Sequence, residues 1–96
     1  MKKRTHEVVD ESAVYAIRLI GAMSRSGRAG LLIRALASRS FQYRLGCFAA
    51  LRCHIHGFSI VNPWQPGAPG HDAFLAGVRE GDRIWKVYAD ERENDE

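Results

Sequence analysis

Long apolar runs are absent from this chain. No segment approaches the roughly 18–20 apolar residues that a membrane-spanning helix requires, and no apolar core follows Lys2, Lys3 and Arg4 as it would in a secretory signal. We therefore expect a soluble, cytoplasmic protein that does not enter a membrane. A chain of 96 residues is also too short for more than one small domain.

Cysteine is scarce, since only Cys47 and Cys53 are present. In a helix these two would lie about 9 Å apart along the axis and on different faces, which excludes a disulfide between them. The nearby His54, His56 and His71 raise the question of zinc. The spacing of these five residues matches none of the common closed zinc sites, so we expect no metal and no cofactor.

Motifs for catalysis are missing as well. The chain has no Gly-x-x-x-x-Gly-Lys-Ser/Thr loop for nucleotide phosphates. Cys53 and His54 are adjacent, so in a helix their side chains would diverge by about 100° and could not act as a nucleophile and its base. We interpret His71 and Asp72 as residues of a helix start, where Asp72 faces the positive end of the helix dipole. The chain is predicted not to be an enzyme.

Acidic residues are few in the first part of the chain. Residues 1–56 contain ten Lys or Arg residues but only Glu7, Asp10 and Glu11 as acids, whereas residues 90–96 are mostly acidic. This polarity favours a phosphate-rich partner, and the alternative is an ordinary solvated basic surface. Arginine is suited to such a partner because its planar guanidinium pairs with phosphate and stacks on bases. The candidate binding residues are Arg25, Arg28, Arg34, Arg39, Arg44 and Arg52, with Phe41 and Tyr43 interleaved.

Helical periodicity is the main structural pattern. It predicts a first helix that begins near Asp10 or Ser12, a glycine- and serine-rich break over residues 24–30, and helices over residues 31–38 and 41–56. Gly57 is placed where a helix C-terminal glycine belongs. The expected apolar faces are Ala13, Ala16, Ile17, Ile20 and Met23; then Leu32, Ala35 and Leu36; then Phe41, Leu45, Phe48 and Arg52 with Cys47, Leu51 and Ile55 beside them.

A proline-rich turn over residues 62–69 joins the third helix to a fourth. Pro63 disfavours a helical conformation at Asn62, and Pro69 suits the first position of a helix. Trp64 lies between prolines, where it could either contact a partner or close the core. We treat Asn62, Pro63, Gly67, Pro69 and Gly77 as structural residues of this region.

The end of the chain is less regular in pattern. Gly81 and Asp82 predict a turn. Residues 83–88 fit a strand or a helical extension, of which we favour the helix because a single strand would have no partner. The predicted organisation is a flexible basic lead over residues 1–9, a single helical domain over 10–89 and a disordered acidic tail over 90–96. The fold class is all-α, a small bundle of three or four short helices with a proline-rich connecting turn.

Residues 44–82 resemble the ribosome modulation factor family, in particular its short prophage-type members. Asn62-Pro63-Trp64 stands for the family's Asn-Pro-Tyr, and Gly67-Ala68-Pro69 for its Gly-Ser-Pro-type helix start. Phe74-Leu75-Ala76-Gly77-Val78 stands for Trp-x-x-Gly-Trp, so that both tryptophans are replaced. The resemblance implies a noncatalytic RNA-binding protein that modulates a ribonucleoprotein machine, with ribosomal RNA or a ribonucleoprotein complex as its partner and translation as the regulated process.

Two alternatives remain open. Residues 76–84 also resemble the Ala-Gly-Leu-x-x-Gly-Asp-x-Ile motif of peptide-binding PDZ domains, which would require a sheet in the C-terminal half. The second alternative concerns function. A small protein of prophage type with its positive and negative charges at opposite ends could instead inhibit a host nucleic-acid-guided defence complex, as an anti-CRISPR does. Its partner would then be a host protein complex. The oligomeric state does not follow from the sequence.

Overall fold

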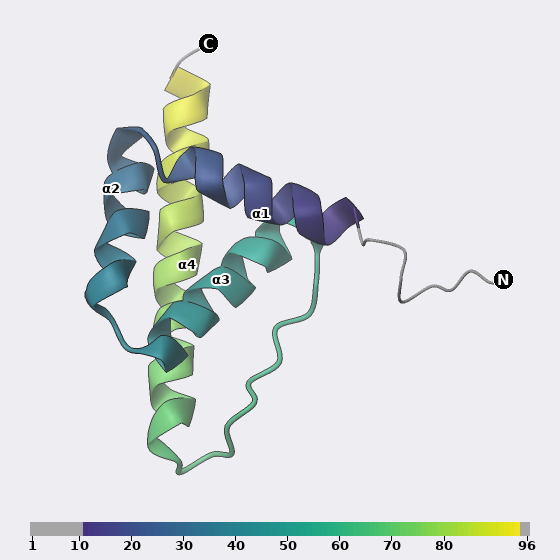
Figure 1. Cartoon of the computed structure of the whole chain (residues 1–96), viewed down its shortest axis with the longest axis vertical. Coiled ribbons are helices and arrows are strands. Elements are labelled where there is room, and N and C mark those ends of the chain that lie inside the picture. Colours follow the sequence, from purple (N-terminus) through teal and green to yellow (C-terminus); the bar gives the residue numbers. More distant parts are fainter. Residues whose placement is uncertain (1–10, 95–96) are drawn as a thin grey trace, which may run out of the picture.

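Four α-helices make up the part of the chain that the structure describes. The computed structural model describes the backbone of residues 11–94 and the side chains of residues 14–93 (Figure 1). Over this range the chain forms α1 (Glu11–Met23), α2 (Gly27–Ala35), the short 3₁₀ turn η2 (Leu36–Ser38), α3 (Phe41–His56) and α4 (Pro69–Asn94). No strand occurs among the described residues. The all-α prediction is confirmed, and the PDZ-type alternative is wrong because residues 76–84 lie inside α4.

The long helix α4 is the rod on which α3 and α2 pack, whereas α1 packs mainly on α3 and α2 (Figure 1). Helix α3 lies diagonally across α4, α2 runs beside it, and α1 crosses near its C-terminal half (Figure 1). The shortest dimension of the molecule is 20 Å, which corresponds to two layers of helices about 10 Å thick each.

Glycines create the contact between α3 and α4. A Cβ atom at Gly46 would overlap the carbonyl oxygen of Phe74, and one at Gly77 would overlap the carbonyl oxygen of Tyr43. A Cβ at Gly81 would lie 2.5 Å from the carbonyl oxygen of Cys47. The two backbones therefore touch each other directly, which only residues without a side chain permit.

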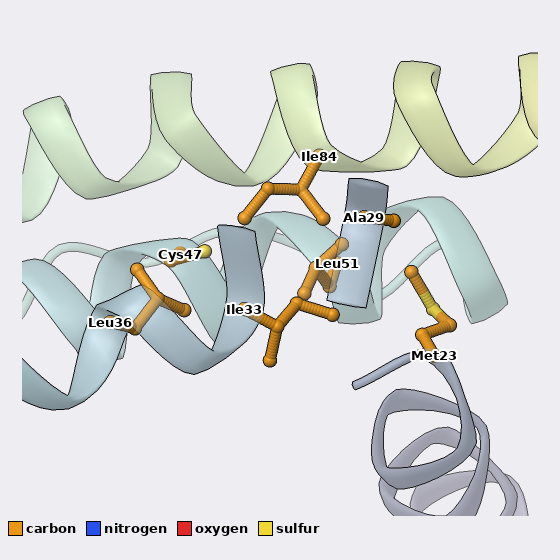
Figure 2. Packing of buried hydrophobic residues seen from close by; sticks show 7 residues of the cluster. All are labelled: Met23, Ala29, Ile33, Leu36, Cys47, Leu51 and Ile84. Atoms are coloured by element: carbon orange, nitrogen blue, oxygen red, sulfur yellow. The ribbon is translucent and has the colours of Figure 1, made fainter. Parts of the chain in front are cut away.

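The apolar core draws on all four helices. Figure 2 shows Ile84 of α4 facing Cys47 and Leu51 of α3, with Met23 of α1 at one end of the cluster. Leu51, Cys47 and Ile84 are fully buried. Ala29, Ile33 and Leu36 complete the cluster from α2 and η2.

The predicted range of α3 and the predicted start of α4 are confirmed. The Ser40 hydroxyl accepts a hydrogen bond from the Tyr43 N–H at 3.2 Å and so caps α3. Gly57 ends α3 in the left-handed conformation with φ of 75°, and Pro69 is the first residue of α4. The predicted basic lead over residues 1–9 lies outside the described residues.

Three boundary predictions are wrong. The break over residues 24–30 is shorter than expected, because α2 already begins at Gly27. Gly81 and Asp82 do not form a turn but lie in the interior of α4, which runs for 26 residues. Residues 83–88 are helical as we favoured, but the helix continues to Asn94, so residues 90–94 are not a disordered tail.

The predicted apolar faces are only partly right. Ala16 and Met23 of α1 are buried, but Ile17 is 68% exposed. On α3 the expected burial of Cys47 and Leu51 is confirmed, but Phe41 is 59% exposed and Arg52 is exposed as well. The face that packs on α4 is centred on Gly46, because close backbone contact there requires small residues. The buried residues of α3 are Gly46, Cys47, Ala50 and Leu51.

Glu91 of α4 caps the N-terminus of α2. Its carboxylate accepts hydrogen bonds from the Arg28 N–H at 2.7 Å and from the Ala29 N–H at 3.4 Å. These N–H groups have no partner within their own helix, and a carboxylate at this end also stabilises the helix dipole. A residue from the acidic end of the chain thus holds α2 in place.

We expect Gly77→Ala to destabilise the protein by about 1–3 kcal/mol, because the new methyl group forces α3 and α4 apart. The measurement is thermal unfolding followed by circular dichroism. Gly21→Ala is the matched control, since nothing lies within 4 Å of a Cβ at this position in α1. The control should gain about 0.5–1 kcal/mol from its higher helix propensity. Equal effects of the two substitutions would contradict the close contact.

We expect Glu91→Gln to lower the free energy of unfolding by about 1 kcal/mol, because the charged partner of the α2 N–H groups is lost. Chemical denaturation measures this value. The exposed Glu93 lies on the same helix, so Glu93→Gln removes the same charge and should change stability by less than about 0.5 kcal/mol. The cap would be refuted if Glu93→Gln cost as much as Glu91→Gln.

Candidate binding surface

The connection between α3 and α4 is held by Asn62. Its side-chain oxygen accepts a hydrogen bond from the Trp64 N–H at 3.0 Å, and its side-chain nitrogen donates to the His71 carbonyl at 3.2 Å. Asn62 thereby ties the extended segment to the first turn of α4. Gly67 supports the turn with φ of +94°, a conformation that favours glycine.

Trp64 packs over the start of α4. A Cβ at Gly70 would lie 2.8 Å from the indole ring, and the ring of Phe74 is 6.1 Å away between centroids. Phe41 meets the indole edge to face at 6.5 Å. The indole is half-buried, so Trp64 helps to close the packing of α3 on α4 and keeps part of its surface exposed.

The arginines of the N-terminal half form one group at the connection between α1 and α2. The Arg34 guanidinium donates a hydrogen bond to the Ser24 carbonyl. This contact brings the guanidinium of Arg34 back from the end of α2 to the segment that carries Arg25 and Arg28. All three arginines are exposed.

The arginines of α3 and its N-terminal flank stack on aromatic rings. The Arg39 guanidinium lies 3.9 Å from the centroid of the Tyr43 ring, and that of Arg52 lies 4.8 Å from the Phe58 ring. Such stacking fixes the plane of the guanidinium and leaves its N–H edge in solvent. Arg44 differs, because it is half-buried.

The side chains of these six arginines have no acidic partner among the described residues. The ion pairs found there join Arg83 to Glu80, His54 to Asp82 and His71 to Asp72. His71 and Asp72 lie in the first turn of α4, as we expected. The six arginines therefore contribute net positive charge to the surface.

A surface contact of His54 with Asp82 and Trp85 was not anticipated. His54 lies 2.9 Å from Asp82 through its Nε2 atom and stacks on the Trp85 ring at 5.6 Å, with 9° between the planes. Nothing in the spacing of residues 54, 82 and 85 links them until α3 crosses α4. Within residues 14–93, His, Cys, Asp and Glu side chains nowhere gather in threes as a metal site requires.

The two cysteines remain thiols and differ in environment. Cys47 is fully buried between α3 and α4, whereas Cys53 is half-buried. Burial raises the pKa of the Cys47 thiol to about 12, and the negative charges of Glu80 and Asp82 add to the rise. Cys47 is therefore an inert core residue at neutral pH.

Comparisons with protein-family models, with curated proteins and with solved structures gave no match. No described helix is long and apolar enough to cross a membrane.

We expect an alkylating reagent at pH 8 to modify Cys53 and to leave Cys47 unmodified in the folded protein, because the thiolate of Cys47 is neither formed nor accessible. Mass spectrometry of peptides from the treated protein measures both sites. Denaturant should make the two cysteines equally reactive. Early modification of Cys47 without denaturant would contradict its burial.

Proposed function

We propose that this protein is a noncatalytic binding protein that docks onto the RNA of a ribonucleoprotein machine and modulates its activity. The observation that carries the proposal is the pair of aromatic-backed guanidinium groups, Arg39 on Tyr43 and Arg52 on Phe58. Each is exposed and lacks a carboxylate partner among the described residues.

The chemistry of these groups suits phosphate. A guanidinium that lies flat on a ring is already oriented, so less side-chain entropy is lost when its N–H edge binds a phosphate. Arg25, Arg28 and Arg34 add positive charge at the α1–α2 connection. Several such contacts give the salt-dependent affinity that is typical of nucleic-acid binding.

The choice of a ribonucleoprotein rests on the resemblance of residues 44–82 to the ribosome modulation factor family. Two helices joined by a turn at Asn62 and Pro63 accord with that resemblance. The partner is then ribosomal RNA or a ribonucleoprotein complex, the regulated process is translation, and the protein acts in the cytoplasm.

Filter binding to a single-stranded ribosomal RNA fragment tests this function. We expect affinity to fall steeply between about 50 and 200 mM salt, with each phosphate contact adding about 0.7 to the logarithmic slope. The double substitution Arg39→Gln, Arg52→Gln should weaken binding and reduce the slope by about 1–2.

Arg83→Gln is the matched control, because it removes the same type of charge from a residue that already pairs with Glu80 at 2.9 Å. It should leave the slope unchanged. Absence of RNA binding, or an affinity that does not respond to salt, would contradict the proposal. If the protein bound a purified nucleic-acid-guided defence complex instead, the inhibitor alternative would replace it.

A further inference from the structure

An apolar groove runs between α3 and the extended segment that follows it. Its cavity volume is about 440 Å³. The apolar lining comes from Leu45 and Phe48 of α3, from Phe58, Val61 and Pro63 of the segment, and from Phe74 of α4. We call it the α3 groove. Figure 1 shows the segment leaving the C-terminal end of α3 and returning to the N-terminus of α4.

The groove exists because α3 turns its small residues toward α4. Gly46 and Ala50 occupy the contact with α4 and Leu51 is buried in the core, whereas Leu45 and Phe48 are only half-buried. Leu45 and Phe48 line the groove, and Val61 across from them is 73% exposed. Exposed apolar surface of this kind is typical of a protein-binding site.

Charge defines the partner further. Residues 12–71 contain no Asp or Glu at all, so neither α3 nor the segment after it carries a negative charge. Arg52 lines the groove, and Arg44 and Arg39 belong to the same helix and its N-terminal flank. An occupant with acidic groups beside its apolar ones is complementary to this surface.

The lining favours apolar side chains over nucleobases. Bases bind proteins by stacking on free aromatic faces and by hydrogen bonds along their edges. Here one face of Phe58 is covered by Arg52 and Phe74 packs against Trp64. The polar residues of the lining are Ser59 and Arg52 alone. Aliphatic and aromatic side chains of a peptide need no such hydrogen bonds.

We propose that the α3 groove binds an acidic amphipathic helical segment of a partner protein. Apolar residues of the segment fill the space between Phe48 and Val61, and its carboxylates pair with Arg52. This mode is the helix-in-groove recognition of short peptides. The proposal goes beyond RNA binding, since it assigns a protein ligand to the apolar lining of the groove, which adjoins the Arg52 guanidinium of the proposed RNA site.

A displayed library of random peptides of about 16 residues, roughly four helical turns, probes the groove of the full-length protein. We expect enrichment of peptides that combine Asp or Glu with apolar residues three and four positions apart. Fluorescence anisotropy of the most enriched peptide then measures affinity. Val61→Ser should weaken this peptide at least about tenfold, because an exposed apolar wall of the groove is lost.

Leu31→Ser is the matched control, since Leu31 is 60% exposed on α2 and does not line the groove. It should change peptide affinity by less than about twofold. Both variants should retain RNA binding in the filter assay. The peptide assay does not depend on RNA, so a natural protein that binds no RNA can still bind the peptide.

The proposal is overturned if no peptide is enriched, if enriched peptides lack acids, or if Val61→Ser and Leu31→Ser act alike. It is equally overturned if a uridine oligonucleotide displaces the peptide and if Val61→Ser weakens the binding of this oligonucleotide.

Discussion

The direct backbone contact between α3 and α4 determines the rest of this structure. Gly46, Gly77 and Gly81 let the two helices approach until carbonyl oxygens meet the positions that side chains would occupy. The close approach fixes how α3 crosses α4. Helices α1 and α2 then cover the core that the crossing leaves open (Figure 1). A small domain buries limited apolar area, so close packing over a short contact is valuable here.

The same contact explains the distribution of chemistry on the surface. Because the face of α3 around Gly46 packs on α4, Phe41 and Arg52 are left exposed and Phe48 is half-buried. Arg52 stacks on Phe58, and Phe48 and Val61 border a groove beside it. Positive charge and apolar surface thus occur next to each other on α3.

The sequence predicted what local chemistry determines. Gly57 marks the end of α3 correctly, and Pro69 opens α4, because the backbone conformation at these positions depends on the local residue. The turn predicted at Gly81 is wrong, because the sequence does not distinguish a glycine that permits a helix–helix contact from one that ends a helix. The candidate arginines are exposed apart from Arg44, but the rings under Arg39 and Arg52 and the α3 groove follow only from the fold.

The cap that Glu91 places on α2 links two distant parts of the chain. Residues 28 and 91 are 63 positions apart, so α2 acquires its anionic partner only after almost all of α4 has been synthesised. During translation the N-terminus of α2 therefore lacks its carboxylate cap until Glu91 has left the ribosome.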